Sequence, residues 1–316
     1  MIQARLHEQE IRGAIGVPGE GDLVMEGVAA LDEAGDRCLY WCRSDMVSRA
    51  REELAGRGGC ILLVPSGAVD DGPLGDCRLL EVRDPRAAVA KVLALIRRLG
   101  RQPAWVESRE IAADAEISPQ AVVEGDVRIA EGAVVGAFCT VGPDVSIGRG
   151  TVLHPGARIY PHVSIGEESV VGPNTVVGVE FAGFVRDETG HNVLMPQLAG
   201  VVIGSHVDIG PLTGIGSGAL KPTTIEDHVK IGGLTGIGHG ARLKRGASIT
   251  SGVMIGGSAV VEADAWVGIN ATVRDSRRVG AGALVGMDVS VQRDLPDGAI
   301  TGAPPPRVVE RRSCGQ

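Results

Sequence analysis

A six-residue repeat occupies most of this 316-residue sequence. Written in sixes from Ile111, the chain runs without a gap to Ala182, resumes for three units at 203–220, and continues over 225–296. All 27 units begin with Ile, Leu or Val, and the fifth position is mostly a small or β-branched residue. A unit of this length holds one short strand and a corner. Three units therefore close a triangular coil, and the repeat predicts about nine coils that pair with their neighbours.

The composition agrees with a prism built from short strands. Glycine accounts for 47 residues, whereas aromatic residues account for only 3%. The core must therefore consist of aliphatic side chains, which the first position of each unit supplies. Glycine recurs at the second position, where we expect it to provide corner dihedral angles that other residues resist. The glycines follow no three-residue period, which excludes a collagen triple helix.

The first hundred residues lack the repeat and predict a small α/β domain. Short apolar runs indicate three strands, and two further segments indicate helices. The strands are expected at 22–31, 38–42 and 58–66, and the helices at 47–56 and 84–100. Asp84 can cap the second helix, and Pro85 suits its first turn.

The chain is therefore expected to contain two domains and a tail. The expected boundaries are 1–108 for a nucleotide- or substrate-binding α/β domain, 109–296 for the repeat domain with an inserted loop at 183–200, and 297–316 for the tail.

Charge and hydropathy exclude several classes of protein. The net charge of −8 and the isoelectric point near 5.4 argue against a partner nucleic acid. No apolar run is long enough for a membrane span, and the first residues lack the apolar segment of a secretion signal. Six scattered cysteines without a CxxC pair indicate free thiols in a reducing compartment. We therefore expect a cytoplasmic protein with no membrane span and no tightly bound cofactor.

The interruption of the repeat at 177–204 carries the most specific signal. It reads VGVEFAGFVRDETGHNVLMPQLAGVVIG, and its end resembles the IPQLGGVVIG segment of the UDP-3-O-acylglucosamine N-acyltransferase family of the lipid A pathway. The segment TVLHPGARIYPHVSIG at 151–166 is similar to the same family, as is the order of domains. The sequence is identified as a divergent member of these hexapeptide-repeat acyltransferases.

The resemblance implies a fold, an assembly and a reaction. The fold is mainly β: a left-handed parallel β-helix of about nine coils behind a small N-terminal α/β domain. The assembly is a homotrimer with active sites between neighbouring prisms. The reaction moves an acyl group from acyl-CoA or acyl carrier protein, as cosubstrate, to the amine of a nucleotide-linked amino sugar.

The resemblance also assigns catalytic roles to His239 and Gly257. His239 lies in IGHG, where the family reads approximately IAHN. Imidazole titrates near neutral pH and suits a general base that takes a proton from the attacking amine. Gly257 follows 18 residues later, one coil on, so it is expected to stack on His239. Its N–H is expected to stabilise the developing oxyanion.

The expected acceptor-binding residues come from two segments. LYWCRSDM stands where the family holds uracil between two aromatic rings, and it offers Tyr40 and Trp41. The inserted loop adds Phe184, His191 and Gln197.

The expected donor-binding residues lie near the end of the repeat. WVGINATVRD at 266–275 resembles the coils of CoA-dependent sugar acetyltransferases. Coenzyme A phosphates would suit Arg274, Arg278 and Arg293 there. No long helix fits after Pro296, where the family has one that helps to hold acyl carrier protein, which favours acyl-CoA slightly as the donor.

Three alternative functions compete with this prediction. One is an acetyl-CoA-dependent sugar N- or O-acetyltransferase for surface polysaccharide or secondary-metabolite biosynthesis. Another is a non-catalytic β-helix scaffold. The third, a γ-type carbonic anhydrase, would need a close histidine pair for zinc, and no HxxxxH occurs in the sequence, so we expect no metal site.

Overall fold

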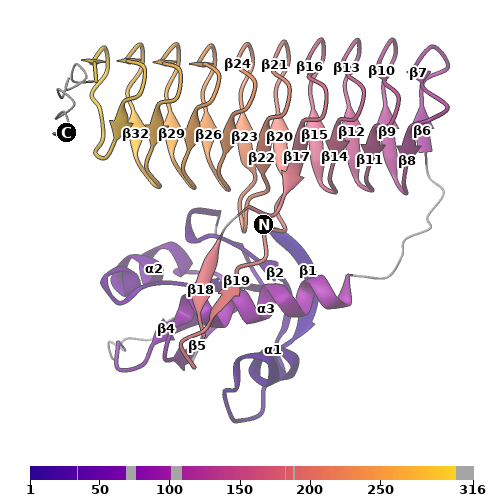
Figure 1. Cartoon of the computed structure of the whole chain (residues 1–316). Helices are drawn as coiled ribbons and strands as arrows, with labels where there is room; N and C mark the ends of the chain where they lie inside the picture. Colours follow the sequence, from indigo (N-terminus) through magenta and orange to yellow (C-terminus); the bar gives the residue numbers. More distant parts are fainter. Residues whose placement is uncertain (34, 69–75, 101–108, 182, 188, 304–316) are drawn as a thin grey trace, which may run out of the picture.

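The computed structural model describes residues 1–33, 35–68, 76–100, 109–181, 183–187 and 189–303. A small α/β domain lies beside a long prism of stacked coils (Figure 1). None of the helices in these ranges has the length and apolar character that a membrane crossing needs.

The small domain is built on a five-stranded sheet of order β1-β2-β3-β4-β5. Its strands are β1 (Ile2–His7), β2 (Val24–Val28), β3 (Cys38–Trp41), β4 (Gly58–Pro65) and β5 (Asp76–Val82). Its α-helices are α1 (Glu8–Ile15), α2 (Val47–Leu54) and α3 (Pro85–Leu99), with short 3₁₀ turns at Leu31–Glu33 and Ser44–Met46. β1 is antiparallel to β2, and the remaining pairs are parallel.

The three strands and two helices expected in this domain are present. Asp84 caps α3 as expected, because its carboxylate accepts the N–H groups of Arg86 (2.9 Å) and Ala87 (3.1 Å). The sequence analysis missed β1, α1 and β5. The strand β1 alternates polar and apolar residues over only six positions, and β5 is exposed or half-buried along most of its length, so neither forms a strong apolar run.

The prism consists of three parallel sheets. Sheet I contains β7 (Glu116–Ile117), β10 (Val134–Val135), β13 (Val152–Leu153), β16 (Val170–Val171), β21 (Asp208–Ile209), β24 (Lys230–Ile231), β27 (Ser248–Ile249), β30 (Trp266–Val267), β33 (Leu284–Val285) and β35 (Ile300–Thr301). Sheet II contains β8 (Val122–Val123), β11 (Thr140–Val141), β14 (Arg158–Ile159), β17 (Val176–Val179), β22 (Gly214–Gly216), β25 (Gly236–Ile237), β28 (Met254–Ile255), β31 (Thr272–Val273) and β34 (Ser290–Val291). Sheet III contains β6 (Arg109–Ile111), β9 (Val127–Ile129), β12 (Val145–Ile147), β15 (Val163–Ile165), β20 (Val201–Ile203), β23 (Thr223–Ile225), β26 (Arg242–Leu243), β29 (Val260–Val261) and β32 (Arg278–Val279).

This arrangement confirms the predicted coils. Each coil contributes one strand to each sheet, and residues 18 apart pair directly, as Val134 does with Val152. The ladder extends slightly beyond the predicted end at Pro296, because β35 pairs with β33.

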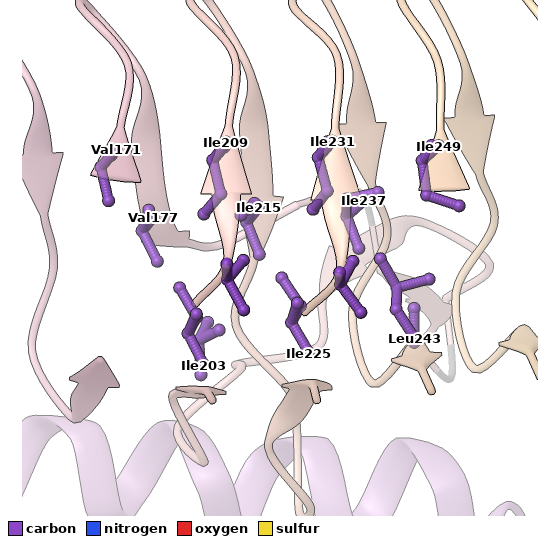
Figure 2. Packing of buried hydrophobic residues seen from close by; sticks show 14 of the residues in the cluster. Val171, Val177, Ile203, Ile209, Ile215, Ile225, Ile231, Ile237, Leu243 and Ile249 are labelled. Atoms are coloured by element: carbon purple, nitrogen blue, oxygen red, sulfur yellow. The ribbon is translucent and has the colours of Figure 1, made fainter. Parts of the chain in front are cut away.

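The first residue of each six-residue unit points into the prism. Figure 2 shows these side chains stacked in layers along the interior. The labelled residues are all at most 4% exposed: Val171, Val177, Ile203, Ile209, Ile215, Ile225, Ile231, Ile237, Leu243 and Ile249. Complete burial of each such side chain contributes about 1.5–3 kcal/mol, so the repeat supplies its own core without aromatic rings.

Most glycines at the second position serve a different purpose from the one expected. Gly148 is not among the residues with positive φ, but a Cβ on it would lie 2.5 Å from the carbonyl carbon of Gly166 in the next coil. The left-handed corner conformation occurs instead at the fourth position, at residues such as Asp144 (φ 55°) and His162 (φ 61°). Second-position glycine therefore allows the coils to stack closely. The expectation about corner dihedral angles holds at Gly178 (φ 87°), beside the interruption, and is wrong for glycines such as Gly148.

The interruption of the repeat forms a hairpin that leans on the small domain (Figure 1). Its strands β18 (Phe184–Arg186) and β19 (Asn192–Leu194) pair antiparallel. Val185 and Met195 are buried in the same apolar cluster as residues of α3. The prism ladder then resumes in register, because Val163 pairs with Val201.

Candidate active site

A cavity of about 990 Å³ lies between the small domain and the prism edge where sheet II meets sheet III. Its lining includes Trp41 and Arg86 from the small domain, Gln197 from the segment after the hairpin, and His239, Gly257 and Asp275 from the prism. Ion pairs join the two sides: Arg97 on α3 binds Glu180 through both carboxylate oxygens (2.9 and 3.2 Å), and Lys221 pairs with Asp32. The small domain is therefore held over this edge of the prism.

His239 occupies the corner that follows β25. Hydrogen bonds to the coils before and after it hold the backbone there. The Gly240 N–H donates to Oγ1 of Thr223 (2.8 Å), and the His239 carbonyl accepts the N–H of Ser258 (2.8 Å). The side chain is half-buried. Burial lowers the pKa of the imidazole below its usual value and the Arg86 cation adds to the decrease, while the Asp275 carboxylate opposes it. The ring is therefore neutral near pH 7 and able to accept a proton.

Gly257 provides the surface against which the imidazole packs. A Cβ on Gly257 would lie 2.6 Å from Nε2 of His239, so only glycine leaves the ring in place. The stacking expected from the 18-residue spacing is therefore present. The Gly257 N–H, however, donates to Oδ1 of Asp275 at 2.8 Å. The expectation that this N–H receives the oxyanion is not supported by the structure, because a carboxylate already occupies it.

Gln197 lines the cavity, and much of its amide already has partners. Its Oε1 accepts the N–H of Phe181 (2.8 Å), and its Nε2 donates to the Phe181 carbonyl (2.9 Å). A Cβ on Gly183 would lie 2.8 Å from the same Nε2 and 3.8 Å from His239. Gln197 thus fixes the turn beside His239, and its bonds to described residues use one of the two N–H groups of its amide.

Trp41 and Tyr40 differ in where they point, because successive residues of a strand face opposite sides of the sheet. Trp41 lines the cavity. Tyr40 has no exposed surface, and its hydroxyl donates to the Gly35 carbonyl (2.8 Å) and accepts the Gly35 N–H (2.6 Å). The expectation that Tyr40 binds substrate is wrong, because its ring is core to the small domain.

Two residues expected from the inserted loop lie on the hairpin and do not line the cavity. Phe184 is 56% exposed. His191 is exposed near the turn, where its Nδ1 lies 2.7 Å from Oγ1 of Thr189. Their expected contact with the acceptor stays a prediction, because neither residue lines the cavity of this chain.

The arginines expected to bind the donor also lie outside the cavity. Arg278 binds Glu262 (2.9 Å) and Asp297 (2.8 Å), so its guanidinium is committed to carboxylates within the chain. Arg274 and Arg293 are exposed, and their role stays a prediction. Residues 304–316 of the expected tail lie outside the described part of the chain.

Sequence reasoning missed Asp275 and Arg86, the two charged residues of the cavity that act on His239. Asp275 had a signal, because it occupies the third position of its unit, one coil beyond Gly257. Arg86 had none, because it reaches the cavity only through the docking of α3.

Comparisons with known proteins agree with this architecture. The family model described as bacterial transferase hexapeptide (six repeats) matches residues 144–178. The UDP-3-O-acylglucosamine N-acyltransferase of Delftia acidovorans is 37% identical over 258 residues, which cover 81% of this chain and 72% of the relative. The protein of the same name from Pseudomonas syringae pv. tomato is 32% identical over 214 residues, which cover 66% of this chain and 59% of that relative.

The solved structures support the fold. The structure of LpxA from Acinetobacter baumannii is similar with a TM-score of 0.50 and 22% sequence identity, over 62% of this chain and 71% of that chain. The prism is thus a left-handed parallel β-helix. Because the Delftia relative shares 37% identity across most of both chains, this protein belongs to the UDP-3-O-acylglucosamine N-acyltransferase family.

Proposed function

We propose that the cavity transfers an acyl group from a thioester to the amine of a nucleotide-linked amino sugar, with His239 as the general base. The observation that carries the proposal is the half-buried imidazole, whose pKa is lowered by burial, in a cavity large enough for a sugar and a thioester. The relatives from Delftia and Pseudomonas bear the name of an N-acyltransferase that acts on a UDP-linked sugar.

The chemistry requires one proton acceptor beside the reacting amine. The amine nitrogen attacks the thioester carbonyl, a C–N bond forms, and the C–S bond breaks. The proton released by the nitrogen goes to His239 and then to the leaving thiolate, so the base is restored. A positioned base of this kind contributes roughly 10²–10⁴-fold to the rate.

The two sides of the cavity suit the two parts of the acceptor. Trp41 and Arg86 offer a ring face and a cation for the nucleotide, and His239 faces the amino sugar from the prism. Gln197 lies on the same side as the base. We assign the acceptor to this position and the thioester to the part of the cavity that Gly257 and Ser258 line.

An apolar edge of the prism supports a homotrimer. Phe138, Leu212, Leu234 and Met287 are all more than half exposed, and all occupy the corners between sheet I and sheet II. Exposed apolar side chains aligned in this way are typical of an interface between subunits. We propose that three chains meet along this edge.

Mass spectrometry of the reaction product tests the proposal. Purified protein is incubated with a UDP-linked 3-O-acyl amino sugar and either an acetyl or a longer acyl group, each carried by coenzyme A or by acyl carrier protein. We expect an N-acylated product, with acyl-CoA the slightly favoured donor. Product formed only from acetyl-CoA would indicate the acetyltransferase alternative, and no product with any donor would indicate a scaffold.

A further inference from the structure

Three residues at the same position of successive coils form a column at the cavity edge: His239, Gly257 and Asp275. The imidazole lies against Gly257, and Oδ1 of Asp275 accepts the Gly257 N–H at 2.8 Å. A Cβ on Gly256 would lie 2.4 Å from the same oxygen, so the carboxylate lies close against this backbone. The backbone of Gly257 is therefore held by Asp275, which belongs to the next coil.

We propose that Asp275 is a positioning residue for His239: it holds the Gly257 backbone under the imidazole and stabilises the imidazolium that forms when His239 takes a proton. This inference rests on the proposed role of His239 as the base. It adds Asp275 to the site as a residue that positions and stabilises the base but does not itself accept the proton from the amine.

Several cations surround the cavity, and they disfavour a positive charge on the imidazole. Arg86 faces the ring from α3 and disfavours a positive charge there. Arg43 also lines the cavity from the small domain, and Lys221 and Arg242 line it from the prism. A proton arriving on the imidazole therefore enters a region that already contains cations, and a nearby anion reduces that penalty.

The remaining acids that line the cavity are engaged elsewhere. Asp84 accepts two N–H groups at the start of α3, and Asp32 and Glu33 both face the Lys221 ammonium. In the described part of the chain, the contact shown for the Asp275 carboxylate is with an uncharged backbone N–H. The Asp275 side chain is exposed, and through the Gly257 backbone it is held on the column that carries the ring. Its negative charge raises the pKa of His239 against the effect of burial.

The test separates the charge of Asp275 from its hydrogen bond. Asp275→Asn keeps an oxygen that can accept the Gly257 N–H and removes the charge, whereas Asp275→Glu keeps the charge. Asp227→Asn is the matched control, because Oδ1 of Asp227 accepts the Ser205 N–H at 2.8 Å in the same way, at another edge of the prism. Arg86→Gln removes the opposing cation.

The first readout is the titration of the His239 ring followed by NMR with ¹³C-labelled histidine, which needs no substrate. We expect the midpoint to move to lower pH in Asp275→Asn and to higher pH in Arg86→Gln. We expect no movement in Asp227→Asn and a return towards the wild-type midpoint in Asp275→Glu. The second readout is kcat at saturating substrates, which should fall about tenfold or more in Asp275→Asn, with KM nearly unchanged.

An unchanged midpoint in Asp275→Asn overturns the inference, as does an equal shift in Asp227→Asn. If Asp275→Asn fails to fold, the inference stands or falls on Asp275→Glu, which must then fold and titrate as the wild type does. A shift of the midpoint in a protein that transfers no acyl group would refute the proposed function and leave the pairing of Asp275 with His239 intact.

Discussion

The Nε2 atom of His239 lies so close to the α-carbon of Gly257 that a methyl group there would come within 2.6 Å of it. The two residues belong to successive coils and are 18 positions apart. The coil spacing, and not a local motif, therefore brings the ring to its packing surface.

Replacement of His239 by Ala should abolish most of the activity. We expect kcat to fall by roughly 10²–10⁴-fold, because the amine loses its proton acceptor. The fold should survive, since the side chain lies at a corner outside the aliphatic core. His206→Ala is the matched control, because His206 is an exposed corner residue of the same prism. Retention of more than about a tenth of native activity would contradict the mechanism and direct attention to His191.

The rate of the native protein should rise with pH along one limb. His239 must be neutral to accept a proton, so activity is absent below its pKa and present above it. Because burial lowers that pKa, the limb should lie at lower pH than the titration of free imidazole. A profile of kcat against pH for wild type and His239→Ala measures this. The idea fails if the variant's residual activity shows the same limb.

Gly257→Ala should impair turnover by displacing the ring. The added methyl group meets the imidazole, whose side chain can rotate away, so we expect lost kcat with a nearly unchanged melting temperature. Gly257→Val should be more severe. Gly302→Ala is the control, since no atom lies within 4 Å of a Cβ there. Equal activity in the two alanine variants would show that the contact with Gly257 is irrelevant.

Glu8 should matter for stability and not for catalysis. Its carboxylate has no exposed surface and binds Arg12 (2.8 Å) and Arg78. Burial alone would raise its pKa, but the hydrogen bonds from Arg78 and Arg12 leave the pKa below its usual value. Glu8→Ala leaves two arginines without their shared partner, and we expect a loss of about 3–5 kcal/mol in the free energy of unfolding of the small domain.

The pH dependence of that effect has a definite sign. Because the folded-state pKa of Glu8 is depressed, its contribution is present above the unfolded pKa and is lost as pH falls through the folded pKa. Denaturant unfolding at several pH values should therefore show wild type and Glu8→Ala converging in acid. Glu52→Ala, an exposed site on α2, should remain within about 0.5 kcal/mol of wild type throughout.

Light scattering tests the proposed assembly. We expect a mass near three times 32.6 kDa. Leu234→Asp places a charge on the apolar edge at its most exposed corner and should shift the mass towards that of one chain. Leu99→Asp, an exposed position on the small domain, should leave the mass unchanged. A wild-type monomer with full activity would rule out a site shared between subunits.

The prism could be predicted from the sequence because one residue type recurs at a fixed period. An aliphatic residue at every sixth position places Ile231, Ile237 and Leu243 on three successive walls, and no long-range information is needed. The reason given for glycines such as Gly148 was wrong, because this residue is constrained by the next coil and not by its own dihedral angles. The pattern within one six-residue unit does not show which atoms of the next coil lie against it.

The site could be predicted only in part for the same reason. His239 and Gly257 follow from the period and the family resemblance, and Asp275 could have been found by continuing one coil further. The expectation for Tyr40 was wrong because the resemblance of a segment does not say which face of β3 each residue occupies. Arg86 depends on how the small domain docks, which rests on pairs distant in sequence such as Arg97 with Glu180.

The hairpin leaves the prism after β17, and the chain returns at β20, which pairs in register with β15, so the insertion changes neither the pitch nor the phase of the prism. The number of coils between the hairpin and His239 is fixed by the small domain, which the pairs Arg97–Glu180 and Lys221–Asp32 hold over this part of the prism. One coil added there would carry the histidine about 4.8 Å along the axis, away from the domain above it. An inserted coil would therefore separate His239 from the small domain if it fell between β20 and β25.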